Sequence, residues 1–346
     1  EDYYEGLENR KFLSLADAIK SRKLIDFTAR PPAPCPDKLG THVLTMEIEE
    51  VMPFIDWNPF FQTWELRGRY PNRGYPKIFN DERVGEEAKK LHHDAVTMLQ
   101  KIMADKSLSL KGIVGLFPAN TVGTEDVEVY ADESRETSLA TFCMLRQQAE
   151  KENDDDPYLS QADFVAPKSS GVADYLGMFA VACFGADEVG AVYDAQMDDY
   201  SKIMVSALAD RLVEAFAEAV HLKIRRELWG YAKDEALKEE DLLKIKYQGI
   251  RPAPGYPSQP DHTEKNTMWE VLRVEDQTGI RLSEQLSMLP ASSVSALVFG
   301  HADSEYFSVG QVCKDQVESY AARKGMDLPV MEKWLTPILG YEPPAE

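Results

Sequence analysis

Apolar residues recur with helical spacing in two long stretches of the chain. Residues 83–106 carry a stripe formed by Ala88, Leu91, Val96, Leu99 and Ile102. Residues 198–229 carry a second stripe, and Gly230 follows its end. That stripe consists of Leu208, Leu212, Ala215, Phe216, Ala219 and Leu222. The spacing predicts one long helix in each stretch, and shorter helices beginning at Lys314 and Leu328.

Other apolar runs have the length and flanking turns of strands. Residues 112–119 (GIVGLFPA) and 126–133 (DVEVYADE) predict an antiparallel hairpin, and residues 293–299 with 305–312 predict a second hairpin near the end of the chain. Residues 41–57 predict a strand followed by a short helix. Hairpins and helices are segregated along the chain rather than alternating, which favours an α+β fold with an antiparallel sheet.

Composition narrows the possible partners and locations. The chain has 346 residues, of which 44% are hydrophobic, so it can bury a sizeable core. Its formal net charge of -21 disfavours nucleic acid and anionic membranes as main partners. No apolar run is long enough to span a membrane. The 4 cysteines form no CxxC pair and the 6 histidines no metal-ligand spacing, so we expect a reducing, cytoplasmic location and no metal site.

Residues 251–257 (RPAPGYP) combine groups that suit ligand binding. Prolines stiffen the segment, and Gly255 allows a close backbone approach. Tyr256 offers a ring for stacking, and the Arg251 guanidinium matches a carboxylate or phosphate. From these residues alone, a rigid connector in which Arg251 makes a structural salt bridge explains the segment equally well.

Several acidic residues have both a structural and a functional interpretation. Asp56 precedes a predicted helix with Asn58 as its N-cap and Pro59 as its first residue, where the helix dipole favours an acid. Asp261 is expected to cap the next helix, with Glu264 completing a capping box.

Three further acids lie on the long helix of residues 198–229. Asp210, Glu214 and Glu218 are spaced i,i+4 opposite its apolar stripe, which describes either a solvated face or a place for a bound cation.

The segment RPAPGYPSQPDHTEK (residues 251–265) closely resembles the Arg-x-x-x-Gly-Tyr signature in the activation domain of cobalamin-dependent methionine synthase. Other segments resemble that family in the same order and span nearly the whole chain: FIDWNPFFQTWELRGRYP, GLFPAN, ADFVAPKSSGVADYLG, DDYSKIMVSALADRLVEAFAEAVH and KDQVESYAARKGM. The resemblance implies a twisted antiparallel sheet with long helices packed around it. It also implies that residues 1–346 form a single activation domain, with a helical subregion near 83–107, cut from a longer multidomain synthase.

The resemblance also implies which residues bind S-adenosylmethionine. The implied ligand residues are Asp56, Glu214, Arg251, Ala253, Gly255, Tyr256, Tyr306 and Phe307. Arg251 suits the ligand carboxylate, Asp56 the ammonium or sulfonium, and the backbone from Ala253 to Gly255 the adenine edge. Val213 replaces an alanine that is usual in the family, and VFGHADSEYF replaces a YFSHPDSKYY-like segment.

The implied role is reactivation of a synthase that makes methionine from homocysteine and 5-methyltetrahydrofolate. The domain would dock over the cobalamin-binding domain of the same protein and present the methyl group of S-adenosylmethionine to reduced cobalamin. The electron would come from a flavodoxin-like or diflavin reductase donor, docking on a local basic patch at residues 20–23 or 221–226. The resemblance calls for no catalytic acid or base, so we expect the isolated chain to bind ligand without turnover.

Two other classes of function remain open at this stage. One is a free-standing S-adenosylmethionine-dependent methyltransferase, although the chain has no glycine-rich strand-to-helix turn of the doubly wound type. The other is an interaction module without a ligand.

Overall fold

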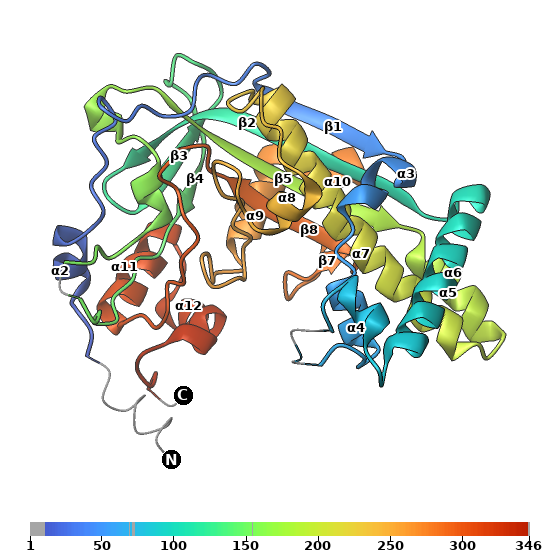
Figure 1. Cartoon of the computed structure of the whole chain (residues 1–346). Helices are drawn as coiled ribbons and strands as arrows, with labels where there is room; N and C mark the ends of the chain where they lie inside the picture. The colour runs from blue at the N-terminus through green and yellow to red at the C-terminus, as the bar shows by residue number, and fades with distance from the viewer. Residues whose placement is uncertain (1–10, 69, 71–72, 154, 345–346) are drawn as a thin grey trace.

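A computed structural model describes residues 11–68, 70, 73–153 and 155–344. Residues 1–10 of the predicted single domain 1–346 lie outside the described residues. A six-stranded antiparallel sheet runs through the described part in the order β4-β3-β2-β5-β8, and β1 also pairs with β2 (Figure 1). Its strands are β1 (Gly40–Met46), β2 (Ser109–Val122), β3 (Asp126–Tyr130), β4 (Ser138–Cys143), β5 (Asp174–Phe184) and β8 (Ser293–Val298). The short strands β6 (Arg281–Leu282) and β7 (Met288–Leu289) pair separately.

The two central strands, β2 and β5, are buried on both faces, so their sequences are nearly continuous apolar runs rather than alternating ones. Ile113 pairs with Ala180, and Val114 pairs with Phe179. The first pair enters one core cluster and the second pair another, because successive side chains point to opposite faces of a sheet. The sheet therefore separates two cores, each of which needs its own cover.

Helices supply those covers. On one face, α7 (Asp199–Lys223) packs against β5 and β8, with α3 (Ile48–Val51), α4 (Asn58–Thr63) and α5 (Gly85–Asp105) against α7. On the other face lie α9 (Glu264–Leu272) and α10 (Val274–Thr278). Helices α11 (Lys314–Lys324) and α12 (Leu328–Leu335) pack together beside β4. Figure 1 shows α11 and α12 below one end of the sheet and α4, α5 and α6 (Ala186–Ala195) below the other.

The remaining helical segments are short. They are α2 (Leu15–Lys20), α8 (Glu239–Leu243), η1 (Met52–Phe54), η3 (Lys77–Asn80), η4 (Gln161–Phe164), η5 (Lys168–Ser170), η6 (Ile224–Leu228) and η7 (Thr336–Ile338). Of these, η6 is a π-helical turn that extends α7 almost to Trp229. In the described residues no helix is both long and apolar enough to cross a membrane.

Most predicted elements are confirmed: the β2–β3 hairpin, the helices α5, α7, α11 and α12, and the α+β class. The second predicted hairpin is wrong, because residues 305–311 form no strand beside β8. Residues 250–252 occupy that edge instead. Ile250 exchanges two backbone hydrogen bonds with Phe299, and Leu297 donates to the Pro252 carbonyl.

Two predicted helix caps are also wrong, because the side chains bond elsewhere. Helix α4 begins at Asn58, and it is Asp56 that accepts the Asn58 backbone N–H at 2.9 Å. Helix α9 begins at Glu264 without a side-chain cap. Asp261 and Glu264 are instead buried around Lys324, which pairs with both carboxylates.

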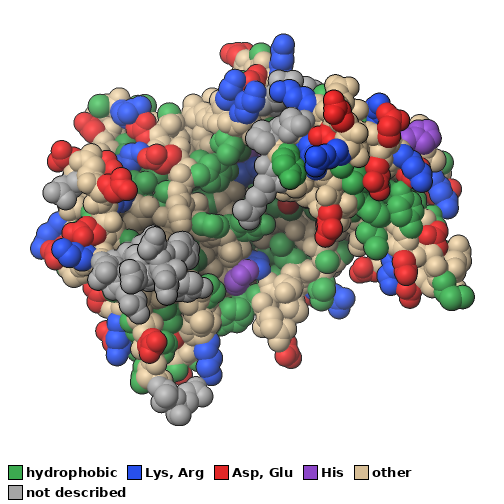
Figure 2. Space-filling view, turned by 60° about the horizontal axis from the view of Figure 1, so that its bottom comes forward, with side chains coloured by type: hydrophobic (Ala, Val, Ile, Leu, Met, Phe, Trp, Pro, Cys, Tyr) green, Lys and Arg blue, Asp and Glu red, His purple; other side chains and the backbone are tan. Residues whose placement is uncertain are grey.

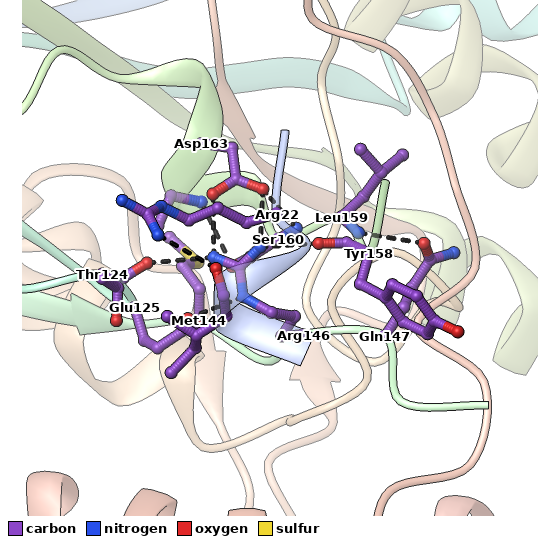
Figure 3. Close-up of polar contacts among 12 residues, drawn as sticks. Arg22, Thr124, Glu125, Met144, Arg146, Gln147, Tyr158, Leu159, Ser160 and Asp163 are labelled. Atoms are coloured by element: carbon purple, nitrogen blue, oxygen red, sulfur yellow. Dashed lines mark hydrogen bonds and ion pairs between the residues drawn. The ribbon is translucent and has the colours of Figure 1, made fainter. Parts of the chain in front are cut away.

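A buried arginine ties the β2–β3 turn to the segment after β4 (Figure 3). Arg146 is 0% exposed, and its guanidinium bonds to the Glu125 and Asp163 carboxylates. It also donates to the carbonyls of Tyr158 and Thr124. Burial raises the pKa of Glu125 and of Asp163, although the guanidinium opposes that shift. The cluster therefore fixes the position of the β2–β3 turn relative to residues 158–163.

Candidate functional site

A groove of about 570 Å³ opens beside α7 and β8. It is lined by Glu214, Arg251, Pro252, Ala253, Tyr256, Pro257, Ser258, Val294, Ala296, Tyr306, Phe307 and Ser308. Six of the eight residues implied by the sequence therefore line one groove, although they come from segments up to 93 positions apart (214 to 307). Figure 2 shows a face of the molecule that is hollowed near its centre, with hydrophobic side chains around the hollow.

The backbone of the arginine segment is fixed by the sheet. Its pairing with β8 holds residues 250–252, and a tight turn follows in which Gly255 donates to the Gln259 carbonyl at 2.7 Å. The Arg251 N–H donates to the Tyr306 hydroxyl at 2.8 Å. Residues 250–252 and 306–308 are thereby held beside each other at the groove. We conclude that the loop is preformed before any ligand arrives.

The side chain of Arg251 is anchored by a residue of α7. Its Nη2 lies 2.7 Å from Glu218 Oε2, and the two side chains are 18% and 8% exposed. Burial alone would lower the pKa of Arg251, but the Glu218 carboxylate, together with Tyr247 and Tyr306, outweighs burial and raises that pKa. Among the described residues, Arg251 Nε and Glu218 Oε1 have no hydrogen-bond partner. The pair is therefore incomplete, and a donor and an acceptor remain available for a ligand.

Aromatic and cationic groups pack beneath this ion pair. The rings of His221 and Tyr247 meet edge to face at 4.8 Å, and the Arg225 guanidinium lies 4.2 Å from the centre of the Tyr247 ring. Burial, reinforced by Arg225 and Arg251, lowers the pKa of His221 well below its usual value. His221 is thus a neutral part of the packing rather than a charged site residue.

Exposed rings form one side of the groove. Tyr256 is 63% exposed and Tyr306 38% exposed, whereas Phe307 is half-buried against Phe164 at 6.2 Å. Together with Ala253, Val294 and Ala296 they make an apolar surface on which a flat ring can stack.

Asp56 lies outside the groove, in an adjoining hollow of about 200 Å³. Glu218 lines the same hollow, together with Trp57, Asn58 and Tyr75. The Arg251–Glu218 pair joins the two spaces, because Arg251 lines the groove and Glu218 the hollow. Asp56 is therefore close to the other implied residues without lining the same surface.

Gly255 does not line the groove either. Its φ is +93°, and an added Cβ would come within 2.2 Å of the His262 ring. A glycine is needed here for the turn and for contact with His262. That Gly255 offers a bare backbone to the ligand stays a prediction.

Sequence reasoning missed Glu218, which it treated as part of an acidic helix face. Asp210 and Glu214 are exposed, but Glu218 is only 6% exposed because α7 is buried around most of its circumference. Small neighbours at Ala215, Ala217 and Ala219 were a usable signal. An acid surrounded by alanines is more easily enclosed by neighbouring elements than one among polar residues.

Most cations of the two predicted docking patches are buried or paired, and donor docking there stays a prediction. Within residues 221–226, His221 and Arg225 are both fully buried, and Arg225 is paired with Glu235 at 2.7 Å. Within residues 20–23, Lys23 is paired with Glu305 and Lys20 with Asp17. Neither segment presents a run of unpaired surface cations.

The groove suits binding better than covalent chemistry. Three carboxylates (Asp56, Glu214 and Glu218) and one guanidinium surround the joined spaces, so their sum is negative. Ser258 lines the groove, and its hydroxyl donates to the Phe307 carbonyl rather than to a base. In the described residues no cluster of three or more His, Cys, Asp or Glu could hold a metal ion.

Two comparisons with known proteins bear on this site. The family model described as "Vitamin B12 dependent methionine synthase, activation domain" matches residues 47–325. A solved structure described as "Crystal Structure of the MetH Reactivation Domain bound to AdoHcy" is similar over 96% of this chain and 99% of that chain. Sequence identity to it is 49%, and the TM-score is 0.91.

Proposed function

Because the chain belongs to the activation domains of vitamin B12 dependent methionine synthase, we propose that it binds S-adenosylmethionine in the groove beside β8. There it presents the sulfonium methyl group for reductive remethylation of cob(II)alamin. The observation that carries this proposal is the gathering of Arg251, Glu214, Tyr256 and Tyr306 around one preformed groove. The similar MetH reactivation domain was crystallised with AdoHcy, a molecule that differs from S-adenosylmethionine by the methyl group and its charge.

Charge supports the choice of ligand. S-adenosylmethionine carries a carboxylate, an ammonium and a sulfonium, so it is a net cation. Three carboxylates and one guanidinium around the groove and its hollow complement that charge. Arg251 Nε, buried without a partner among the described residues, is available to the ligand carboxylate. Adenine would lie on the apolar side formed by the exposed tyrosines.

The chain's contribution is to position the methyl group. The leaving group is already activated by its positive charge, so no general base is needed from the groove. An open groove leaves the methyl group accessible to an acceptor on another domain. Cobalamin, carried by the neighbouring domain, supplies the reduced cobalt that accepts the methyl group. We therefore propose that the isolated chain binds ligand without turnover.

Three further parts of the proposal concern the chain's surroundings. The cobalamin-binding domain of the synthase is its partner. An electron donor of the flavodoxin-like or diflavin reductase class is a second partner, docking through a local patch for which residues 20–23 and 221–226 are the candidates. That the residues form one domain of a longer, cytoplasmic synthase stays a prediction.

Calorimetric titration of the chain tests the proposal directly. We expect saturable one-to-one binding of S-adenosylmethionine, and binding of AdoHcy. ATP serves as a control ligand because it has the same adenosine with an anionic tail, which the acidic site should reject. Absence of binding by S-adenosylmethionine, or equal binding of ATP, would contradict the proposed function.

A further inference from the structure

Glu218 is a carboxylate placed where burial should disfavour it. It is 6% exposed, within a helix whose neighbouring positions are Ala217 and Ala219. One turn earlier, Glu214 reaches the groove as an exposed side chain. A buried carboxylate is tolerated when it is paired, and Glu218 is paired with Arg251 at 2.7 Å. The pair uses a single hydrogen bond, leaving Glu218 Oε1 and Arg251 Nε without partners among the described residues.

The main chain of Arg251 is fixed by the Tyr306 hydroxyl and by the flanking bonds to β8. These contacts do not set the direction of a side chain with several rotatable bonds. Glu218 does so from α7, which packs against β5 and β8. Arg251 is therefore held at two points. The sheet edge fixes its backbone, and Glu218 of α7 binds its Nη2.

The location of the pair matches the two charges at the amino-acid end of a ligand. Arg251 lines the groove, whereas Glu218 lines the adjoining hollow together with Asp56. A ligand carboxylate on the arginine side would complete the hydrogen bond that Arg251 Nε leaves unmade, and a ligand ammonium would face Asp56 on the side of the hollow.

We infer that Glu218 is a positioning residue that orients Arg251 for the α-amino-acid end of the ligand and so determines specificity for that end. This inference rests on the proposed function. It predicts that Glu218 contributes nothing to recognition of the adenosine end, which lies along the tyrosines.

The test compares two ligands on the whole chain. S-adenosylmethionine has the amino-acid end, whereas 5′-methylthioadenosine has the adenosine and the sulfur without it. Glu218→Gln should weaken S-adenosylmethionine binding by at least about tenfold and leave 5′-methylthioadenosine binding within about twofold. Glu227→Gln is the matched control, because this exposed glutamate follows α7 and pairs only with the surface residue Lys223 among the described residues.

A purely structural role for Glu218 would lower the affinity for both ligands together, or for neither, and would overturn the inference. If the unchanged protein binds no S-adenosylmethionine, the proposed function fails first. If it binds S-adenosylmethionine and Glu218→Gln preserves the ratio of the two affinities, only the role of Glu218 fails.

A second pair of variants keeps the test decisive if Glu218→Gln does not fold. Glu218→Asp retains the charge but shortens the reach to Arg251, so the same selective loss is expected. In an Arg251→Met background, adding Glu218→Gln should leave S-adenosylmethionine affinity unchanged while raising thermal stability, because it removes an unpaired buried charge. A further loss of affinity in that background would show that Glu218 acts independently of Arg251, and would overturn the inference.

Discussion

Two arginines at carboxylate clusters differ in how many of their hydrogen bonds are made. Arg146 donates through all three nitrogens, to Glu125, Asp163 and two backbone carbonyls. Arg251 uses Nη2 for Glu218, and its Nε is unpaired among the described residues. A guanidinium has five N–H donors, and Arg146 has a bond for each of them. The comparison indicates that a saturated arginine holds the fold, whereas an unsaturated one beside a groove is available for binding.

The largest expected effect comes from breaking the saturated cluster. Arg146→Met would leave two buried carboxylates without their cation, which costs on the order of 3–5 kcal/mol in the free energy of unfolding. Urea unfolding measures this cost. The surface pair Arg273–Asp276 provides the control, since Arg273→Met should change stability by less than about 1 kcal/mol. A similarly small change for Arg146→Met would contradict the structural role.

A buried carboxylate bonded by backbone N–H groups sharpens the comparison through its pH dependence. Asp174 is buried and accepts the backbone N–H groups of Ala166 and Tyr175. Burial raises its pKa to about 7, whereas the unfolded chain ionises near the ordinary value of 3.8. Below pH 3.8 both states are protonated. Between the two values only the unfolded state releases the proton, so this contribution to stability falls as pH rises towards 7.

Between pH 5 and pH 8 the contribution of Asp174 should fall by on the order of 2–3 kcal/mol. Asp174→Asn removes that titration, so its stability deficit relative to the unchanged protein should shrink over the same range. Unfolding at the two pH values measures the difference. Asp132→Asn is the control, because side-chain and backbone bonds from Ser134 lower the pKa of Asp132 and it stays ionised throughout. A pH-independent deficit for Asp174→Asn would show that Asp174 is ionised in the folded protein.

The unsaturated arginine should show its effect in ligand affinity rather than in stability. Arg251→Lys keeps a charge for Glu218 but loses the planar set of donors, so S-adenosylmethionine should bind about tenfold more weakly. Calorimetry measures the affinity and a thermal melt the stability. Arg251→Ala is a poorer choice than Arg251→Lys, because it would leave the buried Glu218 unpaired. A large fall in melting temperature with unchanged affinity for Arg251→Lys would reverse the assignment.

The smallest effect is expected at the hydroxyl that holds the Arg251 backbone. Tyr306→Phe keeps the ring for stacking but removes the acceptor of the Arg251 N–H, which should cost about 0.5–1.5 kcal/mol of binding or stability. Tyr256→Phe is the matched control, since Tyr256 is exposed on the same groove and no hydrogen bond joins its hydroxyl to Arg251. Equal losses in the two variants would exclude a special role for the Tyr306 hydroxyl.

Local sequence patterns predicted most helices and strands but assigned the wrong segment to the edge of β8. The period of α5 and α7 and the β2–β3 turn are encoded by neighbouring residues, so they could be identified directly. The partner of the β8 edge could not, because residues 250–252 and 305–312 are both short extended segments. Which of the two segments pairs with β8 depends on where each lies in the folded chain.

The candidate site could likewise be predicted only in part from the sequence. The resemblance brought together six residues that line one groove, and it indicated Asp56 nearby. It gave no sign of Glu218, since pairing across 33 positions between a helix and a loop leaves no periodic trace. The packing of other elements around α7 decides that Glu218 is enclosed while Glu214, one turn away, remains open.

The pairing of residues 250–252 with β8 also protects the protein against self-association. An uncovered outer strand offers a row of free N–H and C=O groups on which another chain can assemble. Here the segment that carries Arg251 occupies three of those bonding positions. Changes that loosen this loop would therefore do more than weaken ligand binding, because they would expose a template for aggregation, and resistance to self-association would decline together with recognition.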